Sequence, residues 1–205
     1  MNAVAEQWPI PVVALVCSAG GLDALYRILA KLPSTFPAAV IVLRHQDPRG
    51  RSLLAPLLRG RTTLQVDTAR DGERISAGRV FVAPAGRHTL ITPDGRIALI
   101  VSGDRPPYRP SADLLFTSMA LSAGRRSIAV VLSGHGNDGA TGATAVHRCG
   151  GMVVASDKAT STVFAMPCAT IERGGIVDHV VPVDDIAPLL TTIVAADDVE
   201  SATAA

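Results

Sequence analysis

Cysteines, aromatic residues and an excess of charge are all scarce in this sequence, and each shortage excludes a class of protein. The 205 residues include only three cysteines, and an odd number of widely spaced thiols argues against a disulfide framework or a zinc ribbon. Aromatic residues make up 3% of the chain and the formal net charge is +1, which argues against nucleic-acid binding and against attraction to anionic membranes. We expect small, buried thiols in a reducing compartment at Cys17, Cys149 and Cys168.

Long hydrophobic runs are also absent. No apolar segment reaches the length of about 18 residues that a membrane-spanning helix requires, and the first residues, MNAVAEQWPIPV, lack the charged and apolar regions of a signal peptide. Hydrophobic residues nevertheless make up 48% of the chain, enough for a substantial core. We therefore predict a cytoplasmic protein without membrane insertion, with a short lead at 1–9, one globular domain at 10–194 and a flexible tail at 195–205.

Short apolar runs alternate with helical patterns along most of the chain. Several runs are continuously apolar, as expected for strands that are covered on both faces of a parallel sheet. The expected strands are 12–17, 38–45, 63–69, 79–84, 96–102, 127–134, 152–156 and 176–182. The expected helices are 22–32, 52–58, 112–123, 142–148 and 185–194. This alternation predicts the α/β class, as a three-layer α/β/α fold with a mainly parallel, doubly wound sheet.

One segment departs from this alternation. In RHTLITPDGRIALIV (87–101), Asp94 and Gly95 lie between two strand-like runs, a pattern that is typical of a β-hairpin. We therefore predict an antiparallel hairpin attached to the parallel sheet.

Three strand-like runs end in residues that carry chemistry. The run VVALVC ends at Ser18 and a glycine pair, AVIVLRH ends at His45, and SIAVVLSGHGND passes through a glycine-rich loop to Asp138. In open α/β sheets, reactive groups collect outside the carboxyl ends of the strands. A serine, a histidine and an aspartate brought together there have the composition of an acyl-transfer triad, in which the histidine takes the serine proton and the carboxylate orients the imidazole.

Each of these residues also has a purely structural interpretation. Ser18 is a favourable N-cap for the helix expected at 22–32, and His45 is compatible with an ordinary strand-end histidine. Asp138 suits the cap of a helix that starts near Gly142, or an Asp-Gly turn. Spacing alone does not decide between the structural and the catalytic interpretations.

Two other kinds of site fit the sequence less well. The turn after the first strand lacks the G-x-G-x-x-G and G-K-[ST] patterns of phosphate-binding loops. A metal site has candidate ligands but no paired-histidine helix or cysteine cluster to support it. These candidate ligands are His45, Asp47, His88, His135 and Asp138. We therefore predict neither a cofactor nor a metal.

Beyond single residues, separate blocks of the sequence resemble the catalytic domain of CheB, the protein-glutamate methylesterase of bacterial chemotaxis. The resemblance covers about residues 11–190, with the blocks in the family's order. The blocks are CSAGGLDAL, IVLRHQDP, FVAPAGRHTLI, YRPSADLLFTSMA, VVLSGHGNDGATG and STVFAMPCATIERGGIVDHVVPVDDIAPLL. The resemblance implies a serine esterase. Because only a short lead precedes the first strand, we expect a catalytic domain without the receiver domain that is usual in that family.

The resemblance assigns roles to individual positions. It makes Ser18 the nucleophile, His45 the general base and Asp138 the orienting carboxylate. Backbone N–H groups are the expected donors to the oxyanion, and the glycine pair is expected to leave room for the substrate backbone. The residues expected to bind the oxyanion or position the substrate are Ala19, Gly20, Gly21, Arg109, His135 and Gly136.

The sequence also departs from the family pattern near the expected site. Val16 stands where the family usually has glycine, Cys17 where it has alanine or threonine, and His135 where methionine is common. We expect Cys17 to pack in the core and His135 to add a titratable group near Asp138. The family's His-Met-Pro is His-Gln-Asp-Pro here, which places Asp47 close to the expected base.

The substrate implied by the resemblance is a γ-glutamyl methyl ester on the cytoplasmic helices of a methylated chemoreceptor, with glutamine deamidation as a further reaction. Two alternatives stay open, an esterase or deamidase of a related non-chemotaxis pathway and a non-catalytic scaffold that binds a receptor. The sequence does not fix the oligomeric state.

An arginine-rich segment suggests electrostatic steering toward acidic receptor helices, although a solvated positive face also explains it. Its members are Arg44, Arg49, Arg51, Arg59 and Arg61.

Overall fold

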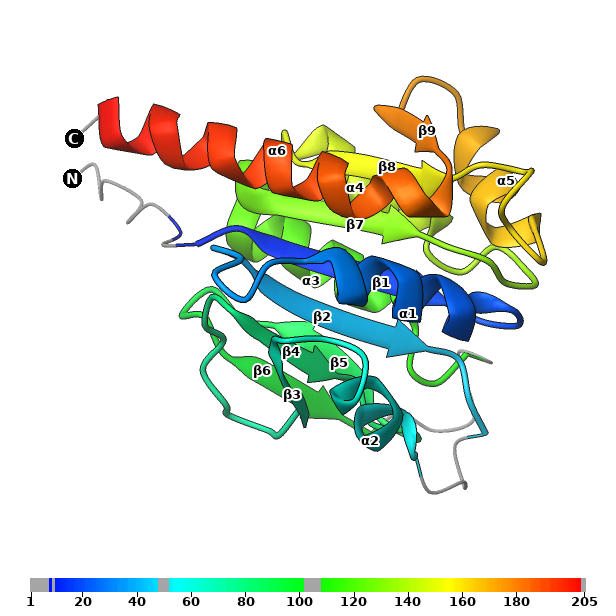
Figure 1. Cartoon of the computed structure of the whole chain (residues 1–205), viewed down its shortest axis with the longest axis horizontal. Helices are drawn as coiled ribbons and strands as arrows, with labels where there is room; N and C mark the ends of the chain where they lie inside the picture. The colour runs from blue at the N-terminus through cyan, green and yellow to red at the C-terminus, as the bar shows by residue number, and fades with distance from the viewer. Residues whose placement is uncertain (1–7, 9, 48–51, 102–107, 204–205) are drawn as a thin grey trace.

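A seven-stranded parallel sheet forms the centre of the protein (Figure 1). The computed structural model describes residue 8 and residues 10–47, 52–101 and 108–203, with the backbone alone at 197–203. The strands of this sheet are β1 (Val12–Cys17), β2 (Ala39–Arg44), β3 (Gln65–Thr68), β4 (Arg79–Val82), β7 (Ser127–Val131), β8 (Met152–Ser156) and β9 (His179–Val181). Their order is β3-β4-β2-β1-β7-β8-β9, and every neighbouring pair is parallel.

Helices cover both faces of this sheet and complete three layers (Figure 1). One face carries α1 (Gly21–Lys31), α2 (Leu54–Arg59) and α6 (Val183–Thr203). The other face carries α3 (Ala112–Ala123), α4 (Ala140–Arg148) and the short α5 (Ala165–Ile171), and a 3-10 turn (Gly124–Arg126) leads from α3 into β7. The predicted α/β class and doubly wound sheet are confirmed. Among the described residues, none of the helices combines the length and the hydrophobicity that crossing a membrane requires.

The central strand β1 shows why the sheet strands are continuously apolar. Every residue from 12 to 17 is fully buried, because successive side chains point to opposite faces and both faces are covered by helices. One set packs against α1 and α6 and the other against α3 and α4. The first set is Val13, Leu15 and Cys17, and the second is Val12, Ala14 and Val16.

The predicted hairpin is present as a sheet of its own. Strands β5 (His88–Ile91) and β6 (Ile97–Ile100) pair antiparallel, and Gly95 takes the positive φ of 77° that their turn requires. The hairpin is fastened to α3, since the backbone of Ile91 hydrogen-bonds to the hydroxyls of Ser118 and Ser122.

Three local predictions were wrong or incomplete. Helix α6 runs to Thr203, so most of the segment expected as a tail is helical, in keeping with its alanine-rich sequence. Helix α5 was not predicted, because it is short and carries Pro167 in its first turn. The segment expected as a lead contributes Trp8 to the core, where Arg126 binds its carbonyl oxygen.

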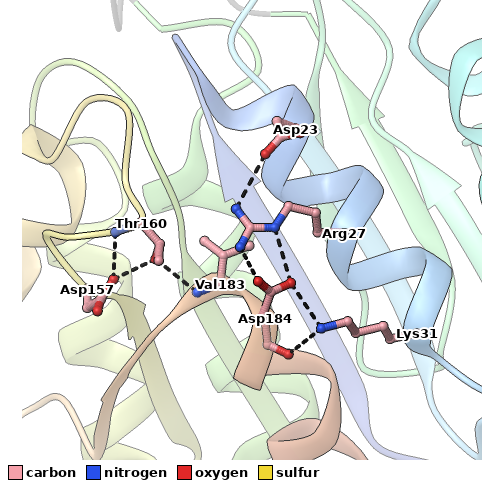
Figure 2. Close-up of polar contacts among 7 residues, drawn as sticks. All are labelled: Asp23, Arg27, Lys31, Asp157, Thr160, Val183 and Asp184. Carbon is pink, nitrogen blue, oxygen red and sulfur yellow. Dashed lines mark hydrogen bonds and ion pairs between the residues drawn. The ribbon is translucent and has the colours of Figure 1, made fainter.

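A polar network on the surface joins α6 to the rest of the molecule (Figure 2). Asp184, in the first turn of α6, accepts hydrogen bonds from Arg27 and Lys31 of α1. Beside it, the hydroxyl of Thr160 donates to Asp157 and accepts from the Val183 N–H at the start of α6. The network therefore ties the start of the last helix to the first helix and to the loop after β8.

Candidate active site

The chemistry-bearing residues lie at the carboxyl edge of the sheet, where the strand order reverses. The chain builds outward from β1 through β2 on one side and through β7 on the other, so β1 and β7 flank the switch point. Cys17 pairs with Arg44, and the N–H of His45 donates to the Cys17 carbonyl. Ser18, the next residue, donates its N–H to the Ser133 carbonyl beyond β7. The ends of three neighbouring strands therefore meet at this corner.

His45 and Asp138 form a buried pair. Nε2 of His45 lies 2.7 Å from Oδ2 of Asp138, and their side chains are 10% and 3% exposed. An ionised carboxylate only accepts hydrogen bonds, so the imidazole donates from Nε2. In the neutral imidazole, Nδ1 is then the nitrogen that can accept a proton, and it is buried without a hydrogen-bond partner among the described residues. The backbone brings His45 next to the residue that precedes Ser18, but the Ser18 hydroxyl does not hydrogen-bond to Nδ1 in this structure.

Asp138 is held ionised by the start of α3. Its Oδ2 also accepts from the Ala112 N–H at 2.7 Å, and its Oδ1 accepts from the Ser111 hydroxyl and the Asp113 N–H, both at 3.0 Å. Burial raises the pKa of Asp138, but the hydrogen bonds from His45 and from the two N–H groups outweigh it and lower the pKa below its ordinary value. The structural interpretation of Asp138 as the cap of α4 is wrong, because Gly139 is the N-cap there.

The Ser18 corner is shaped by close packing. The N-cap of α1 is Gly20 and no side chain caps the helix, so the interpretation of Ser18 as a helix cap is wrong. A Cβ at Gly20 would lie 2.5 Å from Thr162, and one at Gly21 would lie 2.3 Å from the Cys17 Cβ. The glycines are therefore needed for contacts within the protein, and their expected role in leaving room for the substrate backbone stays a prediction.

The candidate oxyanion donors differ in their availability. Among the described residues, the N–H groups of Ala19, His135 and Gly136 donate no backbone hydrogen bond, whereas that of Gly134 donates to the Val163 carbonyl. Gly134, in the glycine-rich loop after β7, is therefore not available as a donor. The side chain of His135 is exposed.

Ser133 ties the candidate oxyanion region together. It is 2% exposed, its hydroxyl donates to the Ala19 carbonyl at 2.8 Å, and the same hydroxyl accepts from the Val163 N–H at 2.9 Å. Its carbonyl accepts from Ser18. The corner after β1 and the loop before α5 are thus fixed by one buried residue that the sequence did not single out.

Two further residues around His45 escaped the sequence analysis as site residues. The ring of Tyr108 stacks on the imidazole, with 4.8 Å between centroids and 19° between planes, and its hydroxyl lies close to Gly136. Ser111 accepts a bond from α3 and donates to Asp138. Both belong to the YRPSADLLF block, where a serine before an apolar helical pattern is the available signal.

His88 and Arg109 lie behind this region. Nδ1 of the buried His88 accepts from the Ser111 N–H at 3.2 Å. Burial lowers the pKa of His88, and the charge of Arg109 lowers it further against the opposing effect of Asp138. Arg109, expected to position substrate, is half-buried next to Tyr108.

The other singled-out residues fall outside this cluster. Cys17 packs in the core as expected, and burial raises its pKa to about 12. The expectation of buried thiols is wrong for the other two cysteines, since Cys149 is exposed and Cys168 is half-buried. Arg59 binds the Val66 carbonyl and Asp67, and Arg61 lies over the Tyr26 ring, so these two arginines serve local structure. Arg49 and Arg51 lie outside the described residues. Among the described residues, no group of three or more possible ligands is arranged to hold a metal ion.

A buried histidine–carboxylate pair beside a serine, at the carboxyl edge of a parallel sheet, has the composition of a serine-hydrolase site. Comparison with known proteins gives the family. The CheB methylesterase family model matches residues 13–190. The chain therefore belongs to the CheB methylesterase family.

Individual relatives agree with this assignment. A protein-glutamate methylesterase/protein-glutamine glutaminase of Moorella thermoacetica is 38% identical over 189 residues, which cover 90% of this chain and 44% of that protein. A protein of the same name from Anaeromyxobacter dehalogenans is 43% identical over 180 residues, covering 86% of this chain and 51% of that one. The chain thus spans about half the length of the curated relatives it matches.

The fold agrees with a solved structure as well. The crystal structure of the Thermotoga maritima CheB methylesterase catalytic domain superposes with a TM-score of 0.87 at 34% sequence identity. The match covers 91% of this chain and 100% of that domain. The shared part is therefore the whole catalytic domain of that protein.

Proposed function

We propose that this chain is a protein-glutamate methylesterase that hydrolyses γ-glutamyl methyl esters on methyl-accepting chemotaxis receptors, with Ser18, His45 and Asp138 as its catalytic triad. The observation that carries the proposal is the buried contact of 2.7 Å between His45 Nε2 and Asp138, which leaves Nδ1 without a hydrogen-bond partner, while the His45 backbone pairs with Cys17, the residue before Ser18. The names of the relatives supply the substrate class.

In the first half of the reaction, His45 Nδ1 takes the proton of Ser18 Oγ as that oxygen attacks the ester carbonyl. Asp138 stabilises the imidazolium through Nε2 without becoming protonated, which its lowered pKa favours. The N–H groups of Ala19 and of His135 or Gly136 supply the donors to the tetrahedral oxyanion, each worth about 2.7–4 kcal/mol in such sites. The imidazolium then protonates the departing methanol, and a glutamyl–serine ester remains.

In the second half, water replaces methanol. His45 Nδ1 deprotonates the water as it attacks the glutamyl–serine ester, and the imidazolium returns the proton to Ser18 as the bond to Oγ breaks. The product is a free glutamate side chain. The same steps on a glutamine release ammonia in place of methanol, and the glutaminase activity in the relatives' names favours this second reaction.

Methanol release from methylated receptor fragments tests the proposal. Ser18→Ala should lower the rate by about 10⁴-fold or more, the scale of losing a serine nucleophile. Ser34→Ala, at an exposed serine in the turn after the C-terminal end of α1, is the matched control and should keep the wild-type rate. Turnover retained by Ser18→Ala contradicts the triad. Receptor binding without methanol release by the wild type indicates a scaffold, and activity on other methylated proteins alone indicates a different pathway.

A further inference from the structure

Asp113, which the proposed mechanism does not use, lies directly behind the carboxylate of the triad. Its backbone N–H donates to Asp138 Oδ1 at 3.0 Å. Its own Oδ1 accepts from the N–H groups of Gly139 and Gly142, at 2.9 and 2.8 Å, at the start of α4. Since Asp138 immediately precedes Gly139, each aspartate binds the backbone of the segment that carries the other.

Two glycines make this exchange possible. Gly139 has a φ of 102°, a conformation that favours glycine, and a Cβ there would meet Ala112 at 3.4 Å. A Cβ at Gly142 would lie 2.6 Å from the Phe116 Cβ and 2.7 Å from the carbonyl oxygen of Asp113. The two helices therefore approach each other backbone to backbone at the point where the Asp113 carboxylate bridges them.

The exchange brings two acidic groups close together in a partly buried place. Burial raises the pKa of Asp113, and the charge of Asp138 raises it further, while the N–H groups of Gly142 and Gly139 oppose both effects. Such a pair is unfavourable unless each carboxylate has its own donors, and the first turns of α3 and α4 provide them. Each of the two carboxylates therefore accepts backbone N–H groups from the helix start next to the other carboxylate.

We infer that Asp113 is a positioning residue of the site: its carboxylate fixes the loop that carries Asp138, and so keeps Asp138 aligned with His45. The inference rests on the proposed function for its kinetic readout only. Every residue type except proline keeps the backbone N–H of residue 113, so replacing the carboxylate with a methyl group removes the bridge to α4 and leaves the direct bond to Asp138 in place.

Steady-state hydrolysis of p-nitrophenyl acetate by Asp113→Ala and Asp113→Asn tests the inference. Asp113→Ala should lower kcat by about 10–100-fold with little change in KM, because a catalytic group displaced by a fraction of an ångström loses rate and not binding. Asp113→Asn keeps an acceptor oxygen and should restore most of the loss. Asp23→Asn, at an exposed carboxylate of α1, is the matched control and should behave as the wild type.

Circular dichroism measures the folded fraction of each variant. If Asp113→Ala does not fold, Asp113→Ser replaces it, since a hydroxyl suits the first turn of a helix but is too short to bridge both glycines. Wild-type kcat in the variant without the bridge overturns the inference. An Asp113→Asn as slow as Asp113→Ala overturns it too, because the acceptor would then be irrelevant.

A second readout does not depend on activity. The proton on His45 Nε2 should give a resolved NMR signal in the wild type and in Asp113→Asn, and an exchange-broadened one in Asp113→Ala. An equally sharp signal in all three proteins overturns the inference. An inactive wild type with this pattern of signals contradicts the proposed function and supports the positioning role.

Discussion

Two aspartates of this protein, Asp184 and Asp138, both have lowered pKa values but reach them by opposite means. Asp184 is half-exposed and lies between the cations of Arg27 and Lys31, which lower its pKa to about 2 (Figure 2). Asp138 is buried, accepts no hydrogen bond from a lysine or arginine in the described part of the chain, and is held mainly by His45 and the backbone of α3.

The difference distinguishes an exposed ion pair that joins two helices from a buried carboxylate in the candidate active site. Exposed ion pairs are screened by salt and gain little net energy, because two long side chains must be ordered. A buried carboxylate bound by fixed N–H groups is pre-organised, and removing its donors or its charge leaves unpaired polar groups in the core. Changes to the buried polar groups around Asp138 should therefore have larger effects than changes to the exposed network around Asp184.

Asp138→Asn should lower kcat on a small ester by about 10⁴-fold, the scale of losing the orienting carboxylate in a triad. The amide NH₂ group of asparagine at position 138 would face N–H donors that now bind the carboxylate. The side chain would also no longer hold the proton of His45 on Nε2. Asp184→Asn is the matched control and should keep the wild-type kcat. The contrast between the two carboxylates is refuted if both variants lose activity to the same extent.

Ser133→Ala should destabilise the protein by about 1–3 kcal/mol, the cost of leaving buried polar groups unpaired. The change removes the donor to the Ala19 carbonyl and the acceptor of the Val163 N–H. Urea unfolding measures the loss, with Ser34→Ala as the exposed control. An unchanged unfolding midpoint would show that the nucleophile corner is held by other contacts.

His88→Asn should flatten the dependence of stability on pH. The pKa of His88 is lowered in the folded state, so around and below pH 6.5 the unfolded chain binds more protons than the folded one. The free energy of unfolding therefore decreases as the pH is lowered. Asparagine supplies an acceptor near the position of Nδ1 without titrating. Urea unfolding at pH 7.5 and 5.5 should show a smaller difference for His88→Asn than for the wild type. Equal differences in the two proteins contradict this account.

Salt should affect the surface network alone. At 1 M NaCl the screening length falls to about 3 Å, so the small loss of stability caused by Asp184→Asn in dilute buffer should shrink toward zero. The loss of kcat caused by Asp138→Asn should not change with salt, because its donors are buried. A loss of stability in Asp184→Asn that persists at high salt would mean that packing, and not charge, joins α6 to α1.

The parallel sheet and the residues at its carboxyl edge could be predicted because short, contiguous sequence patterns indicate them. Continuous apolar runs identify β1 and β7, and a glycine-rich turn after each places Ser18 and Asp138 at the carboxyl edge. Residue pairs such as Cys17 and Arg44 then follow from parallel pairing of neighbouring strands.

What could not be predicted depends on contacts between distant segments. The close approach of Thr162 to Gly20 could not be predicted, because the position of Thr162 depends on the fold of the loop after β8. The donors to Asp138 come from the start of α3, and neither spacing nor periodicity indicates that α3 and the loop before α4 meet. The candidate reactive side chains could be predicted from the sequence, whereas the groups that hydrogen-bond to them and pack against them are identified only by the folded structure.

The most direct measurement of the central claim is covalent labelling by a fluorophosphonate, with the modified residue located by mass spectrometry. If His45 Nδ1 activates Ser18, the wild type and Asp184→Asn should be labelled at Ser18 at the same rate, and His45→Ala and Asp138→Asn should be labelled far more slowly. No labelling of the wild type, or labelling of Ser18 that is unchanged in His45→Ala, would contradict the account.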